Sequence, residues 1–126
     1  MRRLLIFWLA IVSAAAPSWA EVPSGFPTVL WEIRWERLPD TDRIQMILRA
    51  LAPGLEDRGF ESAQGDMDYL CATYGAPLAR LEHARAEEIV VNLADQPVAR
   101  GTTNPDAIQF FALYQVEGGR CISEDF

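Results

Sequence analysis

The chain has 126 residues, of which 50% are hydrophobic and 23% charged, and a formal net charge of −7. This length and composition predict one globular domain, because the chain is too short for two cores and too apolar to remain disordered. All eleven basic residues are arginine, and the acidic balance argues against nucleic-acid binding, which requires a basic patch. A single histidine excludes a metal site built from paired histidines in one chain and argues against most hydrolytic triads.

The first twenty residues have the layout of a secretory signal peptide. Two arginines precede an apolar run over residues 4–16, and the small residues Ser18 and Ala20 occupy the −3 and −1 positions of a cleavage site. We predict export to the periplasm or beyond, with cleavage between Ala20 and Glu21. The mature chain is then a single domain, residues 21–126, without a stable membrane anchor. Cleavage removes two arginines and no acidic residue, so the net charge moves from −7 to −9.

The two cysteines, Cys71 and Cys121, both lie in the predicted mature chain. Two cysteines in a small exported domain favour one disulfide. On the chain-entropy model, closing a loop of about 50 residues stabilises the fold by roughly 4 kcal/mol. A redox role is the alternative, but the sequence has no C-x-x-C motif and no base or cation adjacent to either thiol.

Two strands are predicted in the first half of the mature chain. Residues 28–35 alternate in polarity, which is typical of a half-buried strand and places Trp31 and Trp35 on one face. These tryptophans either line a ligand groove or pack in the core, which is the commoner fate of such residues. Residues 43–51 form a second strand, antiparallel to the first, after the turn around Pro39.

A helix is predicted over residues 62–74, because an apolar stripe recurs there at helical spacing. Ser62 is the expected N-cap, and Gly75 the expected residue just past the C-terminus. Pro77 then either stops the helix or starts another turn, and residues 77–86 could add a short second helix.

The remaining elements are strands. Residues 88–93 (EIVVNL) give the clearest strand pattern in the chain, and residues 98–100 could return briefly as another. Residues 107–117 fit a helix start at Asn104-Pro105-Asp106, but their aromatic and β-branched residues and the following Gly118-Gly119 favour a strand and a tight hairpin. The resulting order is ββαβββ, an α+β domain with an antiparallel sheet packed on one face by one or two helices.

The acidic residues are the first candidates for chemistry. Asp66 and Asp68 lie two apart on the predicted helix, so their side chains point in different directions and do not readily share a ligand. A solvent-exposed helical turn, in which carboxylates favour the helix dipole, explains both more simply. Glu87 and Glu88 are adjacent, which places them on opposite faces of a strand. The one histidine, His83, lies in a polar stretch and is expected on the surface.

Aromatic residues are the second set of candidates. Phe110 and Phe111 point to opposite faces if their segment is a strand, so one of them would be exposed. An exposed aromatic ring beside acidic residues suits a surface that binds a partner. The candidate binding surface therefore comprises six residues: Trp31, Trp35, Asp66, Asp68, Phe110 and Phe111.

Three segments together resemble an uncharacterised family of small exported proteins from Gram-negative bacteria, a domain of unknown function. They are residues 66–71 (DMDYLC), residues 92–98 (NLADQPV), and residues 109–114 (QFFALY) followed by residues 121–124 (CISE). The resemblance covers most of the predicted mature chain and rests on the order and spacing of these segments. It implies export and pairing of Cys71 with Cys121, and no activity, cofactor or site residue.

The leading functional hypothesis is a non-catalytic domain of the cell envelope that recognises another protein or a small ligand, with no metal or cofactor. A sharper form is an inhibitor or accessory of a basic envelope enzyme, because the acidic charge would steer association with a cationic partner. The alternative is a hydrolase of envelope glycan that opposes Asp66 or Asp68 to Glu87 or Glu88, with carboxyl groups roughly 5–9.5 Å apart. A structural component of the envelope is a third possibility.

Overall fold

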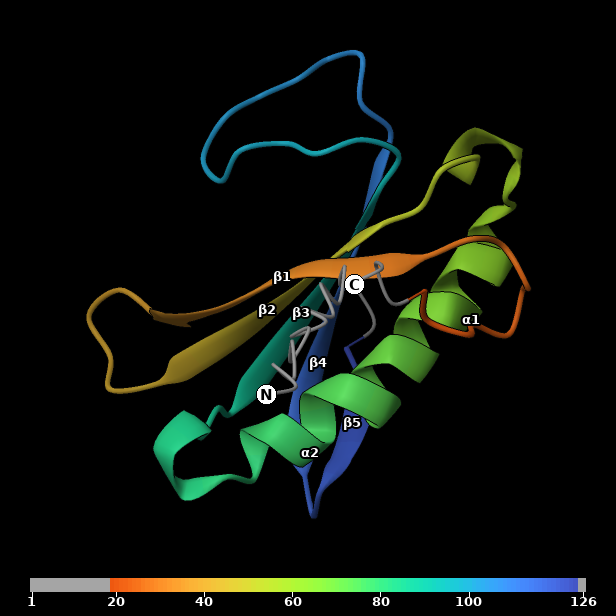
Figure 1. The fold of residues 1–126 in the computed structure, drawn as a ribbon. Helices are drawn as coiled ribbons and strands as arrows, with labels where there is room; N and C mark the ends of the chain where they lie inside the picture. Colours follow the sequence, from red (N-terminus) through yellow and green to blue (C-terminus); the bar gives the residue numbers. More distant parts are fainter. Residues whose placement is uncertain (1–18, 125–126) are drawn as a thin grey trace, which may run out of the picture.

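A computed structural model describes residues 19–124, which form a five-stranded sheet with the helices on one face (Figure 1). The strands are β1 (Val29–Arg37), β2 (Ile44–Leu51), β3 (Glu88–Ala94), β4 (Gln109–Glu117) and β5 (Arg120–Ser123). They lie side by side in sequence order, and the helical region falls between β2 and β3, as the predicted ββαβββ order requires. Almost all of the predicted signal peptide lies outside the described residues. Within residues 19–124, no helix has the length and hydropathy to cross a bilayer.

The sheet is mixed, and the prediction of a wholly antiparallel sheet is wrong at one pair. β1–β2, β3–β4 and β4–β5 are antiparallel, whereas β2 and β3 run parallel, with Met46 opposite Ile89 and Leu48 opposite Val91. The helical connection explains the parallel pair. The helical connection returns the chain from the end of β2 to the end of the sheet where β2 began. β3 therefore starts there and runs in the same direction as β2.

The helical region is longer than predicted. α1 (Phe60–Leu70) begins after Gly59 rather than at Ser62, and it continues through a π-helical turn (Cys71–Gly75) into α2 (Ala76–Ala79). Short 3₁₀ turns lie on either side, at Leu55–Asp57 and Glu82–Ala84. The segment over residues 98–100 is a loop, not a strand.

The π-helical turn explains why neither Gly75 nor Pro77 ends the helix. At this turn the N–H of Ala76 donates to the carbonyl of Cys71, five residues earlier. The wider turn ends two residues before Pro77, whose ring would otherwise crowd the carbonyl four residues back and which has no N–H to donate. Sequence rules that treat glycine and proline as helix ends therefore miss this continuation.

The core lies between the helical region and the sheet. Its fully buried side chains include residues of β2 (Met46, Leu48), β3 (Ile89, Val91, Leu93), β4 (Tyr114) and the helix (Met67, Leu70). At Gly75 the helix lies so near the sheet that a Cβ atom there would be 3.0 Å from Cδ1 of Ile89 and 3.1 Å from Cδ1 of Leu48. A disulfide joins Cys71 to Cys121, with the Cα atoms 6.2 Å apart, and confirms the predicted link between the helix and the last strand.

Candidate functional site

The two tryptophans of β1 lie on opposite faces, so the prediction that they share one is wrong. A β-bulge between Leu30 and Glu32 inserts Trp31 as an extra residue and shifts the alternation of the strand. Trp31 lies under the guanidinium of Arg49, 4.6 Å from its ring centre, on the face without helices. Trp35 lies on the helix side, where its Nε1–H donates to the carbonyl of Ala84 at 3.0 Å. The two rings therefore do not form one groove.

Asp66 is completely buried, which corrects the expectation of a solvent-exposed carboxylate. It forms an ion pair with Arg58, whose Nη1 lies 2.9 Å from Oδ2, and both side chains are 0% exposed. The backbone N–H of Ser24 donates to Oδ1 at 2.9 Å, and the Ser24 hydroxyl donates to Oδ2. Burial lowers the pKa of Arg58, and the charge of Asp66 opposes that shift. Asp66 thus ties the N-terminal segment to α1 and is not part of a binding surface.

Asp68 is exposed and lies beside the sheet. Its Oδ1 accepts hydrogen bonds from the hydroxyl of Tyr114 at 2.6 Å and from Nε2 of Gln64 at 2.9 Å. Burial raises the pKa of Tyr114 far above its usual value, and the bond to Asp68 raises it further. The phenol therefore stays protonated and donates to Asp68, which fixes this carboxylate at the border between α1 and β4.

Phe110 and Phe111 point to opposite faces, as predicted for a strand. Phe110 is partly buried and packs edge-on against Phe60 of α1, with ring centres 5.9 Å apart. Phe111 is 60% exposed on the other face, and Phe60 is itself 64% exposed. Two large aromatic rings are therefore exposed at the same end of β4.

The outer edge of β4 is only partly covered by β5. The pairing of the two strands runs from Glu117 to Tyr114, and the N–H of Glu124 then donates to the carbonyl of Leu113 at 3.1 Å. Backbone groups of a strand point alternately to its two neighbours, so those of Gln109 and Phe111 point to the same side as those of Leu113. No residue in the range 19–124 pairs with them there.

A groove of about 450 Å³ lies at this open part of the edge. Its lining comes from α1 (Phe60, Gln64, Asp68), β4 (Phe111, Ala112, Leu113) and the end of the described chain (Ser123, Glu124). The lining contains two carboxylates and no basic residue. We call this feature the edge groove; it brings together Asp68 and Phe111 from the predicted binding surface.

The glutamates predicted as partners of the aspartates lie elsewhere. Glu88 points to the helix-free face, where it pairs with Nη2 of Arg43 at 2.7 Å. Glu87 lines a depression beside Ala79, and Asp68 lies eleven residues before Ala79, about 16 Å along the helix axis. Neither glutamate faces Asp66 or Asp68 across a cleft, and the arrangement gives the glycan-hydrolase alternative no support. Among the described residues, no group of three or more metal-ligating side chains comes together.

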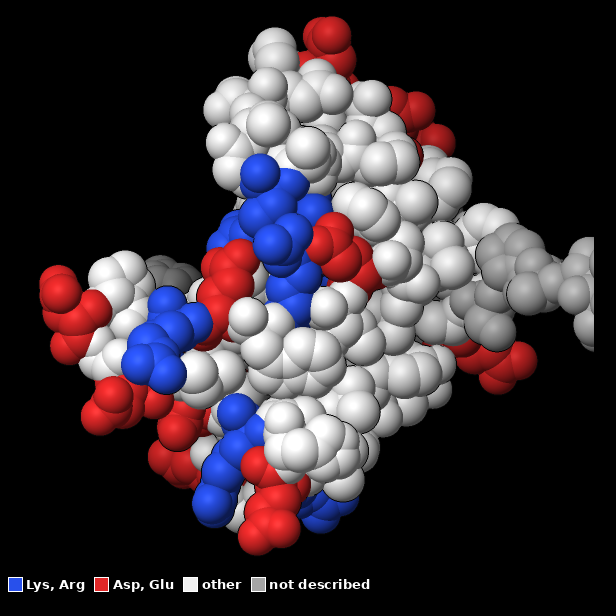
Figure 2. Space-filling view, turned by 60° about the vertical axis from the view of Figure 1, so that its left-hand side comes forward, with Lys and Arg blue, Asp and Glu red and all other residues white. Residues whose placement is uncertain are grey.

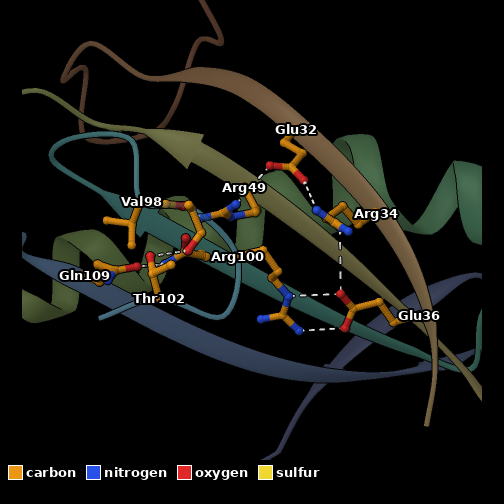
Figure 3. Close-up of polar contacts among 10 residues, drawn as sticks. Glu32, Arg34, Glu36, Arg49, Val98, Arg100, Thr102 and Gln109 are labelled. Carbon is orange, nitrogen blue, oxygen red and sulfur yellow. Dashed lines mark hydrogen bonds and ion pairs between the residues drawn. The ribbon is translucent and has the colours of Figure 1, made fainter. Parts of the chain in front are cut away.

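Charged side chains alternate on the face of the sheet that lacks helices. Glu32 accepts from Arg34 at 3.0 Å and from Arg49 at 2.9 Å, and Glu36 accepts from Arg100 at 3.0 and 2.7 Å. We call these five residues the charge ladder. In Figure 2, blue and red side chains interleave across the middle of the molecule, and Figure 3 shows the contacts that join the ladder from Arg49 to Arg100.

The loop between β3 and β4 folds over one end of this face. Arg49 donates through Nη2 to the carbonyl of Val98, and Arg100 forms the paired contact with Glu36, so two arginines tie the loop to the sheet (Figure 3). The loop and sheet line an open cavity of about 170 Å³. Sequence reasoning missed this site, because its residues come from three strands and a loop. The only signal was the alternation of glutamate and arginine over residues 32–36.

The chain matches a family of unknown function, DUF6497, over residues 7–126, and therefore belongs to it. The match confirms the resemblance to an uncharacterised family. No curated protein and no solved structure shows significant similarity to the chain.

Proposed function

We propose that the protein is an exported, non-catalytic binding module of the bacterial cell envelope, and that the edge groove binds an extended, positively charged segment of a partner protein. The observation that carries the proposal is the edge of β4 at Gln109 and Phe111, which no residue in the range 19–124 pairs with and which lies between the exposed rings of Phe60 and Phe111 and beside two carboxylates. Unpaired strand edges readily accept another strand, and proteins usually protect them.

The backbone of β4 supplies the affinity. A partner segment in extended form would pair with the outward N–H and C=O groups of Gln109 and Phe111, in the manner of a peptide that adds a strand to a sheet. Its side chains would then alternate between the two faces, toward Phe60 on the helix side and Phe111 on the other. Large aromatic rings, phenylalanine among them, are enriched in the buried centre of protein–protein interfaces.

The carboxylates supply the charge preference. Asp68 is held in place by Tyr114, and Glu124 accepts a hydrogen bond from Gln115 across the β4–β5 pair. With no basic residue in the lining and a net charge of −7 on the chain, the groove attracts cations. Such complementarity mainly raises the association rate, and it weakens as salt screens it.

Export is supported by the disulfide, because such bonds persist in oxidising compartments. Cleavage between Ala20 and Glu21 would remove the pairing of Trp19 with Val29 and the bond from the Ala20 N–H to the carbonyl of Thr28. We expect the protein recovered from its bacterium to begin at Glu21 in an intact-mass measurement. A mass that retains residues 1–20 would contradict cleavage.

The binding site is tested with a photo-crosslinking residue at position 111 in cells, followed by affinity measurements on the partner that mass spectrometry identifies. We expect Phe111→Ala to weaken binding by at least about tenfold, since a buried aromatic anchor commonly contributes more than about 1.4 kcal/mol. Ile122→Ala is the matched control, because Ile122 is 40% exposed on β5 outside the groove lining. Equal affinities of the Phe111→Ala variant and the unmodified protein would overturn the proposal.

The charge preference is tested with two double variants of equal charge change. Asp68→Asn with Glu124→Gln should slow association and flatten its dependence on salt. Asp40→Asn with Asp42→Asn changes an exposed turn away from the groove and should leave both unchanged. If both variants slow association equally, net charge rather than the groove steers the partner.

A further inference from the structure

The cavity under the loop between β3 and β4 is a second site. Its lining shares one residue, Phe111, with the lining of the edge groove. Its floor comes from β2 (Gln45, Ile47, Arg49), β3 (Val90, Asn92) and β4 (Gln109, Phe111), and its roof from Val98, Ala99, Arg100, Gly101 and Thr102. A volume of about 170 Å³ is the space that about five or six liquid waters occupy. The site therefore suits a small molecule rather than a peptide segment.

The lining contains two arginines and no acidic residue, although the chain as a whole is acidic. Arg49 is 5% exposed, and its two Nη atoms already bond Glu32 and the carbonyl of Val98. Arg100 gives Nε and Nη2 to Glu36, which leaves Nη1 without a partner among the described residues. One guanidinium donor of this lining residue, whose side chain is 41% exposed, is thus free to meet a ligand, and the paired contact with Glu36 fixes the plane of the guanidinium.

A side-chain amide supplies a second free donor. Nδ2 of Asn92, a residue only 2% exposed, donates to Oε1 of Gln109 at 3.3 Å. Within residues 19–124 the Nε2 of Gln109 meets no acceptor, so its N–H groups are available to a ligand. Apolar side chains complete the walls: Ile47, Val90, Val98 and Phe111.

We infer that this cavity binds a small organic monocarboxylate. The carboxylate would accept hydrogen bonds from Nη1 of Arg100 and Nε2 of Gln109, and the short apolar part would lie against the walls. A concave site with apolar walls and a few convergent polar groups is the usual form of a small-molecule site. A carboxylate offers two acceptor oxygens to these two donors, whereas an amide of the same shape offers one, so the carboxylate is the preferred ligand even though both arginines are paired with glutamates outside the lining.

Butyrate is the probe, and butyramide is its uncharged counterpart of equal shape. Titrated into the protein labelled with ¹⁵N, butyrate should shift the amide signals of Asn92, residues 98–102 and Gln109. Butyramide should bind at least about tenfold more weakly. The inference would be overturned if these signals did not shift with butyrate at up to about 50 mM, a concentration that reveals even a millimolar ligand. Equal binding of butyrate and butyramide would also overturn it.

Two substitutions with opposite expected effects separate ligand recognition from simple opening of the loop. Arg100→Gln removes the free donor and should weaken butyrate binding by at least about fivefold. Glu36→Gln removes the competing negative charge, and its amide oxygen can still accept from Arg100, so it should strengthen butyrate binding. Both substitutions weaken the tie between loop and sheet, and a change in the same direction for both would contradict the inference. Arg120→Gln, an exposed arginine on β5, is the control of equal charge and should change nothing.

The edge groove provides an independent readout. Arg100→Gln should leave partner binding at the groove unchanged, because Arg100 does not line it. Loss of butyrate binding with intact partner binding, or the reverse, therefore tests the two sites separately.

Discussion

The two faces of the sheet differ in what they contribute. The helix-covered face is apolar and tightly packed. The two charged side chains buried beside it, Arg58 and Asp66, form an ion pair with each other. The opposite face has the charge ladder, a polar cavity and an exposed phenylalanine. The difference shows that stability is concentrated on one face, whereas side chains with unused hydrogen-bonding capacity collect on the other.

Two buried arginines illustrate the contrast. Arg58 and its partner Asp66 are both 0% exposed, and no ligand could reach either of them. Arg49 is almost as buried, but its partner Glu32 is 24% exposed and its guanidinium lines the cavity. A buried arginine thus closes the structure on the helix side and forms part of a candidate binding site on the other.

The largest expected effect comes from breaking the buried pair. Asp66→Asn should lower the free energy of unfolding by about 3–5 kcal/mol, because it leaves the charge of Arg58 buried without a counterion. Chemical denaturation measures this loss. Asp68→Asn is the control on the same helix, and it should cost about 1 kcal/mol or less, since the amide oxygen can still accept from Tyr114.

Smaller changes in stability, of opposite sign, are expected when two glycines of the helical region are replaced by alanine. A Cβ atom at Gly65 would meet no other side chain within 4 Å, so Gly65→Ala should raise stability by about 1 kcal/mol through helix propensity alone. Gly75→Ala adds the same propensity but pushes against the buried methyl groups of Leu48 and Ile89. We expect a net loss of about 1 kcal/mol. Thermal or chemical unfolding measures the stability of both variants. If both substitutions raised it equally, the helix and the sheet would have to be able to move apart at Gly75.

The smallest effect is expected on the helix-free face. The contact with Arg100 holds the pKa of Glu36 below its usual value, so the stability that it contributes is present above the pKa of the unfolded carboxyl. That contribution disappears as the pH falls through the lower folded-state pKa. Glu36→Gln should therefore cost under about 1 kcal/mol at pH 7 and nothing in strong acid. A cost that stayed constant with pH would show that packing, not charge, links the loop to the sheet.

Much of the fold was predictable from the sequence, because short-range patterns determine it. The strand over residues 88–93 and the hairpin at Gly118-Gly119 have clear local signals, and the structure confirms both. The parallel pairing of β2 and β3 was not predicted. It follows from the length of the helical connection, and the sequence signals at Gly75 and Pro77 suggested a shorter helix. Local alternation described β1 correctly as a strand, but a single inserted residue at Trp31 reversed its face.

The candidate sites were harder to predict than the fold. The exposed position of Phe111 follows from alternation, whereas its place beside Asp68 depends on packing of α1 against β4. Asp66 has the same residue type as Asp68, and only its distant partners Ser24 and Arg58 distinguish a buried carboxylate from an exposed one. Contacts between residues far apart in the chain leave no local pattern in one sequence.

The disulfide has a mechanical consequence. Together with the chain between its ends, it forms a covalent ring that contains α2, β3 and β4, while β1, β2 and α1 lie outside that ring. A pulling force on the two ends of the chain would therefore peel β1 and β2 from the sheet and then meet the bridge, which cannot extend. The strand that contributes to the edge groove and the helix turn behind it would stay tethered to each other under load, which would suit the proposed binding at that groove.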